Sequence, residues 1–497
     1  MSEIWQSIDI IDRIIAIVTI IITTISFAIN ICNFIKEHWY WRRNNEKKSS
    51  YHNDHFARET IKYRFNDIIS TINDEISNEE ENISYADFQN TTICNLNLGE
   101  SEALQTNGNA AQRELMSMWL NNLSTYGNKK ISEIVTEIPF IDAEFLFYFY
   151  IIIKTSHLDD EKKQKLHPEY NKVVGTQFDP YKVCKLKAIE KDFLNDCEEK
   201  NDGDYHSKIK QCLDFITTIN NGMNDKKWRE ILFESEPNIL HTNLSSNSSD
   251  LSQMFWSRFN NVHPHIDHSS DFWNDYCTDV SGKNIHIIVD NYGIEFLCDL
   301  LLGFYFIKKG AQKITYHVKS IPMFVSDIVE NDQKILFDQL KTLINNSKSP
   351  AKGSYQTALE DLMRVAGESF EFKANYFWNL PFNFSQLITN SQVAKKSSTQ
   401  ELLKEAKSLL TNDNLLIVKG DLNYRKLVED RLWDYRKKTA DKVKYIKSPL
   451  LIIRSYKSNI VMDCNNKSIK ELKALYGSDW KTEGQVGSIL FFPSKHS

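Results

Sequence analysis

The feature that most constrains the fold is an alternation of short β-branched runs and longer helical segments in the second half of the chain. Residues 284–289 (NIHIIV) form an apolar run typical of a buried strand, and residues 293–308 follow with the length of a helix. Residues 313–318 (KITYHV) indicate a second strand. Strands that alternate with helices favour a mostly parallel sheet with helices on both faces.

Three more apolar runs extend this pattern, and they lie at residues 415–418, 449–453 and 459–462. Each is short and bounded by polar residues, as expected of a strand. We therefore expect an α/β domain over residues 256–497.

The first part of the chain has a helical texture instead. Apolar residues recur every three or four positions between Ile61 and Ile76, which predicts one buried helix face. Segments 114–123 and 140–154 also indicate helices. We expect an α-helical region over residues 55–255, which a polar linker at 44–53 joins to the N-terminal segment.

Length and composition limit the class of protein. A chain of 497 residues suggests two or three domains. A mean hydropathy of -0.44 excludes a polytopic membrane protein, and a pI near 6.1 argues against nucleic acid as a partner. No G-x-G or G-x-x-x-x-G-K motif is present, and the eight cysteines form no C-x-x-C pair. The cysteines indicate reduced thiols in a cytosolic compartment.

One segment departs from this average. Residues 14–35 contain no charged side chain, and these 22 residues would span about 33 Å as a helix. Residues 36–48 hold five Lys and Arg against two Glu. This asymmetry predicts a single-pass membrane anchor, residues 1–48 with their basic flank, and a cytoplasmic position for the rest of the chain. The alternatives are a buried core helix or an interfacial helix. A cleaved signal peptide fits poorly, because three of the four charged residues before the run are acidic.

Polar side chains follow four of the predicted strands. Asp290 and Asn291 follow the first, Asp327 lies beyond the second, and Lys419, Asp421 and Asn423 follow the third, with Arg454 and Lys457 after the fourth. Ligands of open α/β sheets bind beyond the carboxyl ends of the strands, so these residues predict a polar site at one edge of the sheet.

The residue types suit a divalent cation beside an anion. Asp290, Asn291 and Asp327 offer the hard oxygen ligands that Mg²⁺ and Mn²⁺ prefer. Lys419, Arg454 and Lys457 could neutralise phosphate oxygens. Ordinary roles remain open for several of these positions. Asp290 and Asp327 could cap helices, Asp421 and Asn423 could form a turn, and Lys319 and Arg425 could be surface charges.

The same segments resemble the damage-control metal phosphatases, a family also described as protein-glutamate methyltransferase-like. The matching strings are IIVDNYGIEFLCDLLLGFYF, YHVKSIPMFVSDI, IVKGDLNYRKLVEDRLWD and PLLIIRSYKSN. IPFIDAEFLFYFY and FDPYKVCKLKAI are weaker matches upstream, and RSYK resembles the RTxK motif of one branch. Two features depart from the family: a Trp-Gly-Asn string is missing, and Phe149 stands where an arginine is expected. Both lie in the helical region and bear on the choice of substrate.

The resemblance implies a three-layer α/β/α, Rossmann-like sandwich with a helical N-terminal region. It implies that Asp290, Asn291 and Asp327 bind Mn²⁺, Mg²⁺, Co²⁺ or Ni²⁺. The residues that it assigns to the substrate are Glu295, Lys419, Asp421, Asn423 and Lys457.

The activity that this implies is hydrolysis of a small phosphorylated metabolite, such as a sugar phosphate or a damaged phosphometabolite. Asp290, Asp421 and Lys457 are then the candidate catalytic residues, and Arg454 is a further substrate contact. Two alternatives stay open. One is carboxyl methylation of protein glutamates with S-adenosylmethionine, although no glycine-rich loop follows the first strand. The other is a catalytically silent binding module tethered to a membrane.

Overall fold

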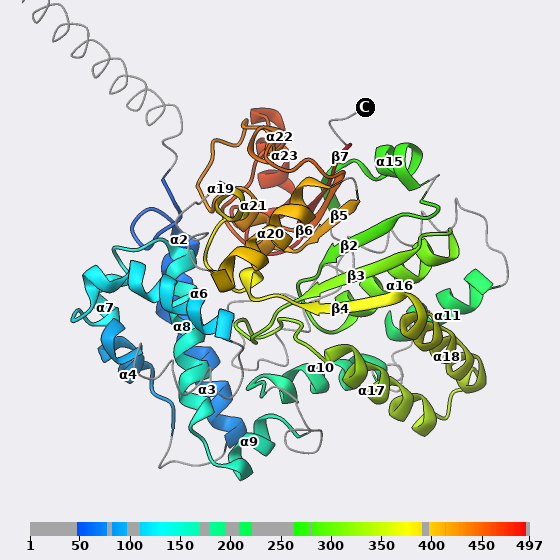
Figure 1. Ribbon diagram of the computed structural model, residues 1–497, viewed down its shortest axis with the longest axis horizontal. Coiled ribbons are helices and arrows are strands. Elements are labelled where there is room, and N and C mark those ends of the chain that lie inside the picture. The colour runs from blue at the N-terminus through cyan, green and yellow to red at the C-terminus, as the bar shows by residue number, and fades with distance from the viewer. Residues whose placement is uncertain are drawn as a thin grey trace, which may run out of the picture. The chain divides into compact units, whose positions relative to one another are not determined.

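The computed structural model describes residues 47–76, 82–96, 110–168, 178–194, 208–220, 263–277, 280–389, 397–412 and 414–493. Within them, one seven-stranded sheet has the order β1-β7-β6-β5-β2-β3-β4 (Figure 1). The strands are β1 (His263–Asp267), β2 (Asn284–Ile288), β3 (Lys313–Val318), β4 (Phe370–Ala374), β5 (Leu415–Lys419), β6 (Leu450–Ser455) and β7 (Val486–Phe492). Neighbouring strands are parallel except β6 and β7, which are antiparallel.

Helices cover both faces of the sheet, which confirms the predicted α/β fold (Figure 1). Ile285 and Ile287 of β2 share one apolar core with helices that include α11 (Lys208–Asn220), α16 (Ile294–Lys308), α17 (Asp332–Asn346) and α18 (Lys352–Ser369). Ile288 points to the opposite core, which contains α8 (Phe140–Ser156), α19 (Phe384–Thr389), α20 (Ser397–Thr411) and α21 (Asp421–Leu427). This alternation is the two-residue period of a pleated strand.

The strand order creates a switch point between β2 and β5. From β2 the chain proceeds through α16 to β3 and then to β4, whereas from β5 it proceeds in the other direction to β6. The two strands pair in parallel, with Ile288 opposite Val418, so their carboxyl ends lie next to each other. In open α/β sheets this is where ligands bind.

The helical region as far as α9 (Asp160–Leu166) packs on the same sheet face as α21, whereas α11 packs on the opposite face. Helix α2 (His55–Glu59) continues through a π-helical turn, η1 (Thr60–Arg64), into α3 (Phe65–Ile76), and α8 is almost entirely buried.

The remaining helices of the described residues, from both regions, are α4 (Tyr85–Asn90), α6 (Ala110–Asn122), η3 (Ser124–Tyr126), α7 (Ile131–Ile134), α10 (Lys182–Leu194), α15 (Ser269–Phe272), η6 (Trp273–Cys277), η7 (Tyr376–Trp378), α22 (Thr439–Lys442) and α23 (Asn466–Tyr476). The helices expected at 61–76, 114–123 and 140–154 are confirmed.

Several other predictions are wrong. Residues 459–462 form no strand, because the Ile460 carbonyl accepts a hydrogen bond from the Arg454 guanidinium instead of pairing in a ladder. The sequence reasoning missed β1, β4 and β7. The linker expected at 44–53 is partly packed, because Ser49 is buried and its main-chain N–H donates to the Asp430 carbonyl at 3.1 Å.

The predicted anchor at residues 14–35 lies outside the described residues. In the part of the chain that the structure describes, no helix has the length and apolar character to cross a membrane.

Candidate active site

A pocket with a cavity volume of about 90 Å³ opens beyond the carboxyl ends of β2 and β5. Its walls come from the segments after β2, β3, β5 and β6 and from the helical region. The lining residues are Phe56, Arg64, Glu144, Asp290, Asn291, Phe324, Val325, Ser326, Asp327, Asp421, Leu422, Arg425 and Lys457. Five predicted site residues therefore meet at the switch point: Asp290, Asn291, Asp327, Asp421 and Lys457.

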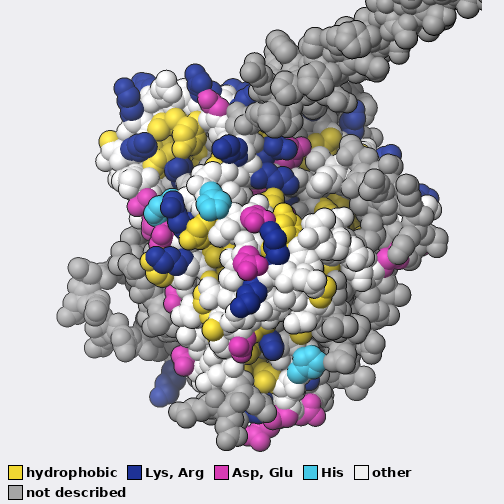
Figure 2. Space-filling model, turned by 90° about the vertical axis from the view of Figure 1, so that its left-hand side faces the viewer, with side chains coloured by type: hydrophobic (Ala, Val, Ile, Leu, Met, Phe, Trp, Pro, Cys, Tyr) yellow, Lys and Arg dark blue, Asp and Glu magenta, His cyan; other side chains and the backbone are white. Residues whose placement is uncertain are grey.

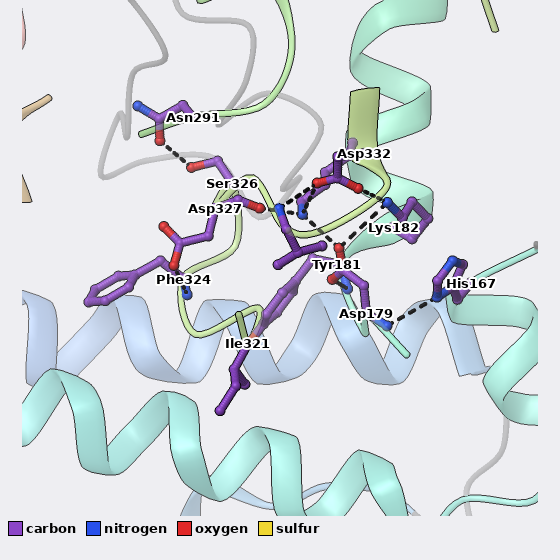
Figure 3. A network of polar contacts seen from close by, with 12 residues as sticks. His167, Asp179, Tyr181, Lys182, Asn291, Ile321, Phe324, Ser326, Asp327 and Asp332 are labelled. Carbon is purple, nitrogen blue, oxygen red and sulfur yellow. Dashed lines mark hydrogen bonds and ion pairs between the residues drawn. The ribbon is translucent and has the colours of Figure 1, made fainter. Parts of the chain in front are cut away.

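The acidic side of the pocket is built after β2 and β3. Asn291 Nδ2 donates to Asp290 Oδ2 and to Glu295 Oε2, each at 3.0 Å. Ser326 Oγ donates to Asn291 Oδ1 at 2.5 Å (Figure 3). Asn291 and Asp327 also form an isolated antiparallel bridge. These bonds bring both segments together and fix the direction of each side chain.

Burial shapes the electrostatics of this side. It raises the pKa of Asp327 to about 7, although the Lys319 ammonium pulls the pKa down. The pKa of Asp290 is also raised by burial. Burial and the nearby Asp290 raise the pKa of Glu295 to about 7. Carboxyl groups with such shifts gain from a cation placed beside them.

The donor set fits a hard divalent cation. Among the described residues, no group of three or more His, Cys, Asp and Glu side chains is arranged to hold a metal ion. A site here therefore needs the amide of Asn291 as a third donor besides the carboxylates of Asp290 and Asp327. Carboxylate and carboxamide oxygens are the ligands that Mg²⁺ and Mn²⁺ prefer.

The basic side of the pocket is built after β5 and β6. Arg454 is buried and contacts Asp421 Oδ1 at 2.7 Å, and its guanidinium also stacks on Tyr424. Lys457 is half-buried in the pocket wall, and burial lowers its pKa while Glu295 and Asp290 oppose that shift. The charge of Asp421 is thus balanced by Arg454, whereas the Lys457 ammonium faces the cavity.

Gly420 allows the two sides to approach each other. It has a φ of 84°, which side chains rarely adopt, and it precedes Asp421 at the start of α21. A Cβ atom at this position would lie 1.9 Å from Asp290 Oδ2. Only glycine lets the end of β5 pass this close to the Asp290 carboxylate.

Four other predicted residues do not line the pocket. Lys419 Nζ lies 3.0 Å from Asp299 Oδ1 on α16. Asn423 donates to the Lys419 carbonyl at 2.8 Å and accepts from Lys319 at 3.2 Å. Arg454 and Glu295 are buried behind Asp421 and Asn291, respectively. Their direct contact with a substrate stays a prediction.

Two residues considered as surface charges are buried. Lys319 is 1% exposed and bonds Asn423. Arg425 is 4% exposed, with Glu144 at 2.8 Å and Asp430 at 2.7 Å. The interpretation as surface charges is wrong for both residues. For Arg425 the reason is that α8 covers this part of α21 and supplies the carboxylate of Glu144.

The helical region adds pocket residues that the sequence reasoning missed, namely Phe56, Arg64 and Glu144. The sequence does hold a signal for Glu144, which is a charged residue inside the otherwise apolar helix α8. For Arg64, the signal is structural, since the π-helical turn that ends there is a feature common at functional sites.

The outer face of the helical region carries mixed charges. Figure 2 shows Lys and Arg side chains interspersed with Asp and Glu side chains on this face. An example is Lys129, which lies 3.3 Å from Glu137 with about half of each side chain exposed. Such pairs are screened and contribute little, so the charges that matter to chemistry are those inside the pocket.

Comparisons with known proteins give one family. The model of the damage-control phosphatase ARMT1-like domain matches residues 163–471. The zebrafish Danio rerio has a similar protein, named damage-control phosphatase ARMT1, with 28% identity over 46% of this chain and 49% of its own length. Proteins of the same name from Bos taurus and Mus musculus are 25% and 32% identical, over 85% and 42% of this chain and 86% and 43% of theirs. The chain thus spans about half the length of the zebrafish relative.

A solved structure of a DUF89 family protein from Pyrococcus horikoshii matches 79% of this chain and 95% of its own. The identity is 14% and the TM-score is 0.29.

Proposed function

The chain belongs to the damage-control phosphatase ARMT1-like family, and from this premise we propose that it is a metal-dependent phosphatase of small phosphomonoesters. The observation that carries the proposal is the pairing of two kinds of group across the switch point. Asp290 and Asp327 are buried carboxylates that face the pocket, and the Lys457 ammonium faces the same cavity. A divalent-cation site next to a cationic side chain is a combination that stabilises the transition state of phosphoryl transfer.

Asp290, Asn291 and Asp327 would hold the divalent cation, which supplies Lewis acidity and a bound water of lowered pKa. The candidates that we propose for this cation are Mn²⁺, Mg²⁺, Co²⁺ and Ni²⁺. Ser326 keeps the Asn291 amide in place, and the main-chain N–H of Phe324 bonds Asp327 Oδ2 at 3.2 Å. These contacts hold the donors before a ligand arrives, so little reorganisation is needed.

Lys457 would bind a phosphoryl oxygen and stabilise the charge that develops on it. Asp421 is paired with Arg454, and it would orient the substrate or exchange a proton with the leaving group. The remaining wall combines Phe56, Phe324 and Leu422 with charged groups. The small cavity and this mixed wall favour a small polar metabolite over a macromolecule.

The test is phosphate release from a panel of small phosphomonoesters with each of the four metals. Asp290→Ala and Asp327→Ala should each lower turnover about 10²–10³-fold, because each removes a ligand of the cation that would act on the reacting phosphate. Asp338→Ala is a matched control, since Asp338 is exposed on α17. Unchanged turnover in either pocket variant contradicts the assignment, and transfer of labelled methyl groups to glutamyl carboxylates would favour the methyltransferase alternative.

We also propose that residues 14–35 anchor the protein in a membrane, with the phosphatase on the cytoplasmic side. The support is the uncharged 22-residue run and the basic residues that follow it. Membrane fractionation of the full chain and of residues 49–497 tests this. Equal recovery of both proteins in the soluble fraction contradicts the anchor.

A further inference from the structure

A buried cation from α10 holds the main chain of Asp327. Lys185 Nζ donates to the Asp327 carbonyl at 2.5 Å, to Asp179 Oδ2 at 2.6 Å and to Asp332 Oδ2 at 3.3 Å. An ammonium group has three N–H donors, and these contacts use all three. Figure 3 shows Asp179, Lys182 and Asp332 in this network, beside Asp327.

The network is fully enclosed by protein. Lys185, Asp179 and Asp332 are each 0% exposed. Burial alone would lower the pKa of Lys185, but Asp179 and Asp332 outweigh it and raise that pKa above its ordinary value. The ammonium therefore stays charged. A buried charge needs such partners, because an unpaired one is very costly in a medium of low polarity.

The segment that carries Asp327 is held from the other side by β2. The Ile328 N–H donates to the Asp290 carbonyl at 3.3 Å, and the Tyr292 N–H donates to the Ser326 carbonyl at 2.7 Å. The main chain of Asp327 thus lies between the sheet and Lys185, while its carboxylate faces the pocket.

We propose that Lys185 is a positioning residue, which fixes the direction of the Asp327 carboxylate in the pocket by holding the carbonyl of the same residue. The inference rests on the proposed function for the role of Asp327 in catalysis. Its geometric part, that Lys185 orders the segment from Phe324 to Ile328, does not. Partners of metal ligands typically change metal affinity or activity by about 10- to 100-fold when they are removed.

The same helix offers two control residues. Lys182 lies one turn before Lys185, is equally buried, and pairs with Asp332 and, at 4.0 Å, with Asp179. Its ion pairs thus reach the network but not Asp327. Lys187 is half exposed and pairs with Glu75.

The experiment compares Lys185→Met, Lys182→Met and Lys187→Met in the full chain. We measure kcat, KM, the Mn²⁺ dissociation constant and the midpoint of thermal unfolding. Lys185→Met and Lys182→Met should both lower the midpoint, since each leaves buried carboxylates with one cation fewer. Lys185→Met alone should weaken Mn²⁺ binding and lower kcat about 10- to 100-fold. Lys187→Met should match the wild type.

A double-mutant cycle separates positioning from general stability. In the Asp327→Asn background, Lys185→Met should cost no further Mn²⁺ affinity, because the ligand that it positions is already gone. Equal losses of Mn²⁺ affinity in Lys185→Met and Lys182→Met, or an undiminished loss in the Asp327→Asn background, overturn the proposal.

Hydrogen exchange keeps the inference testable whatever the activity proves to be. Faster exchange of the Ile328 amide in Lys185→Met, with β5 amides unchanged, supports positioning even if the wild type releases no phosphate, which would refute the proposed function alone. Unchanged exchange at Ile328 overturns the inference. If Lys185→Met does not fold, Asp179→Asn removes one charged partner at constant size and should give the same pattern with a smaller amplitude.

Discussion

The two sides of the switch point are built from similar residues but are neutralised differently. On the β5–β6 side, Asp421 is paired with Arg454 at 2.7 Å. On the β2–β3 side, burial raises the pKa of both Asp290 and Asp327, and the nearby Lys319 ammonium offsets that rise only in part. Asp421 therefore has a directly bonded counter-charge, whereas Asp290 and Asp327 would gain further from an added cation.

This difference explains how one pocket can accept a cation and an anion together. The β2–β3 side has oxygen donors and a raised affinity for positive charge, whereas the β5–β6 side presents Lys457 with Asp421 already satisfied. Each side is also tied to the helical region by a different buried pair: Lys185 reaches Asp327 from α10, and Glu144 of α8 reaches Arg425. The helical region thus supports both halves of the site.

The largest expected effect comes from a change that forces the two sides apart. Gly420→Ala places a methyl group against the Asp290 carboxylate at a backbone φ of 84°. Turnover should fall about 10²-fold or more, because small displacements of catalytic groups are costly, and the free energy of unfolding should drop by about 2 kcal/mol. Phosphate release and thermal unfolding measure both.

The control for this variant is Gly353→Ala on α18. Gly353 has open space around its Cβ position and no positive φ, so alanine there should stabilise the helix by up to about 1 kcal/mol. Wild-type turnover in Gly420→Ala would show that the close approach of β5 to Asp290 is dispensable.

The sequence predicts which strand ends lie together, since parallel strands deliver their carboxyl ends to one edge of the sheet, and five of the nine predicted site residues line the pocket there. The pleat also explains Lys419. Leu415 and Ile417 face the core around α16, so Lys419 continues that face and meets Asp299. A two-residue period applied to β5 could have predicted this orientation from the sequence.

The contribution of the helical region could not be predicted in this way. The spacing of apolar residues shows that a helix buries one face, but it does not show which part of the sheet covers that face. The positions of Arg64, Glu144 and Lys185 at the site depend on such long-range packing. The same limit explains why Arg425 was interpreted as a surface charge.

A smaller effect should distinguish phosphate binding on the β5–β6 side from metal binding on the β2–β3 side. Lys457→Met should lower kcat/KM for a phosphomonoester about 10- to 100-fold, which is the loss of one charge-assisted hydrogen bond, without weakening Mn²⁺ binding. Asp327→Asn should weaken both. Kinetics and Mn²⁺ titration measure the two quantities, and Lys467→Met serves as control because its side chain is 85% exposed. Loss of Mn²⁺ affinity in Lys457→Met would show that the two sides act as one unit.

The smallest expected effect is a loss of folding stability at acidic pH, through a histidine that contacts the Asp179–Lys185 network. His167 Nδ1 accepts a hydrogen bond from the Asp179 N–H at 3.0 Å, and burial lowers the pKa of His167 from 6.5 to about 4. Between these values the unfolded chain binds a proton that the folded chain does not, so stability falls as the pH drops below 6.5. The loss at pH 5.5 is about 1 kcal/mol, and His167→Gln should remove it. Unfolding free energies at pH 7 and pH 5.5 measure the difference, with exposed His52→Gln as control.

Because His167 contacts the Asp179–Lys185 network, lowering the pH should also speed hydrogen exchange at the Ile328 amide before it affects the amides of β5. Simultaneous loss of protection in both segments would contradict a separate opening of the β2–β3 side.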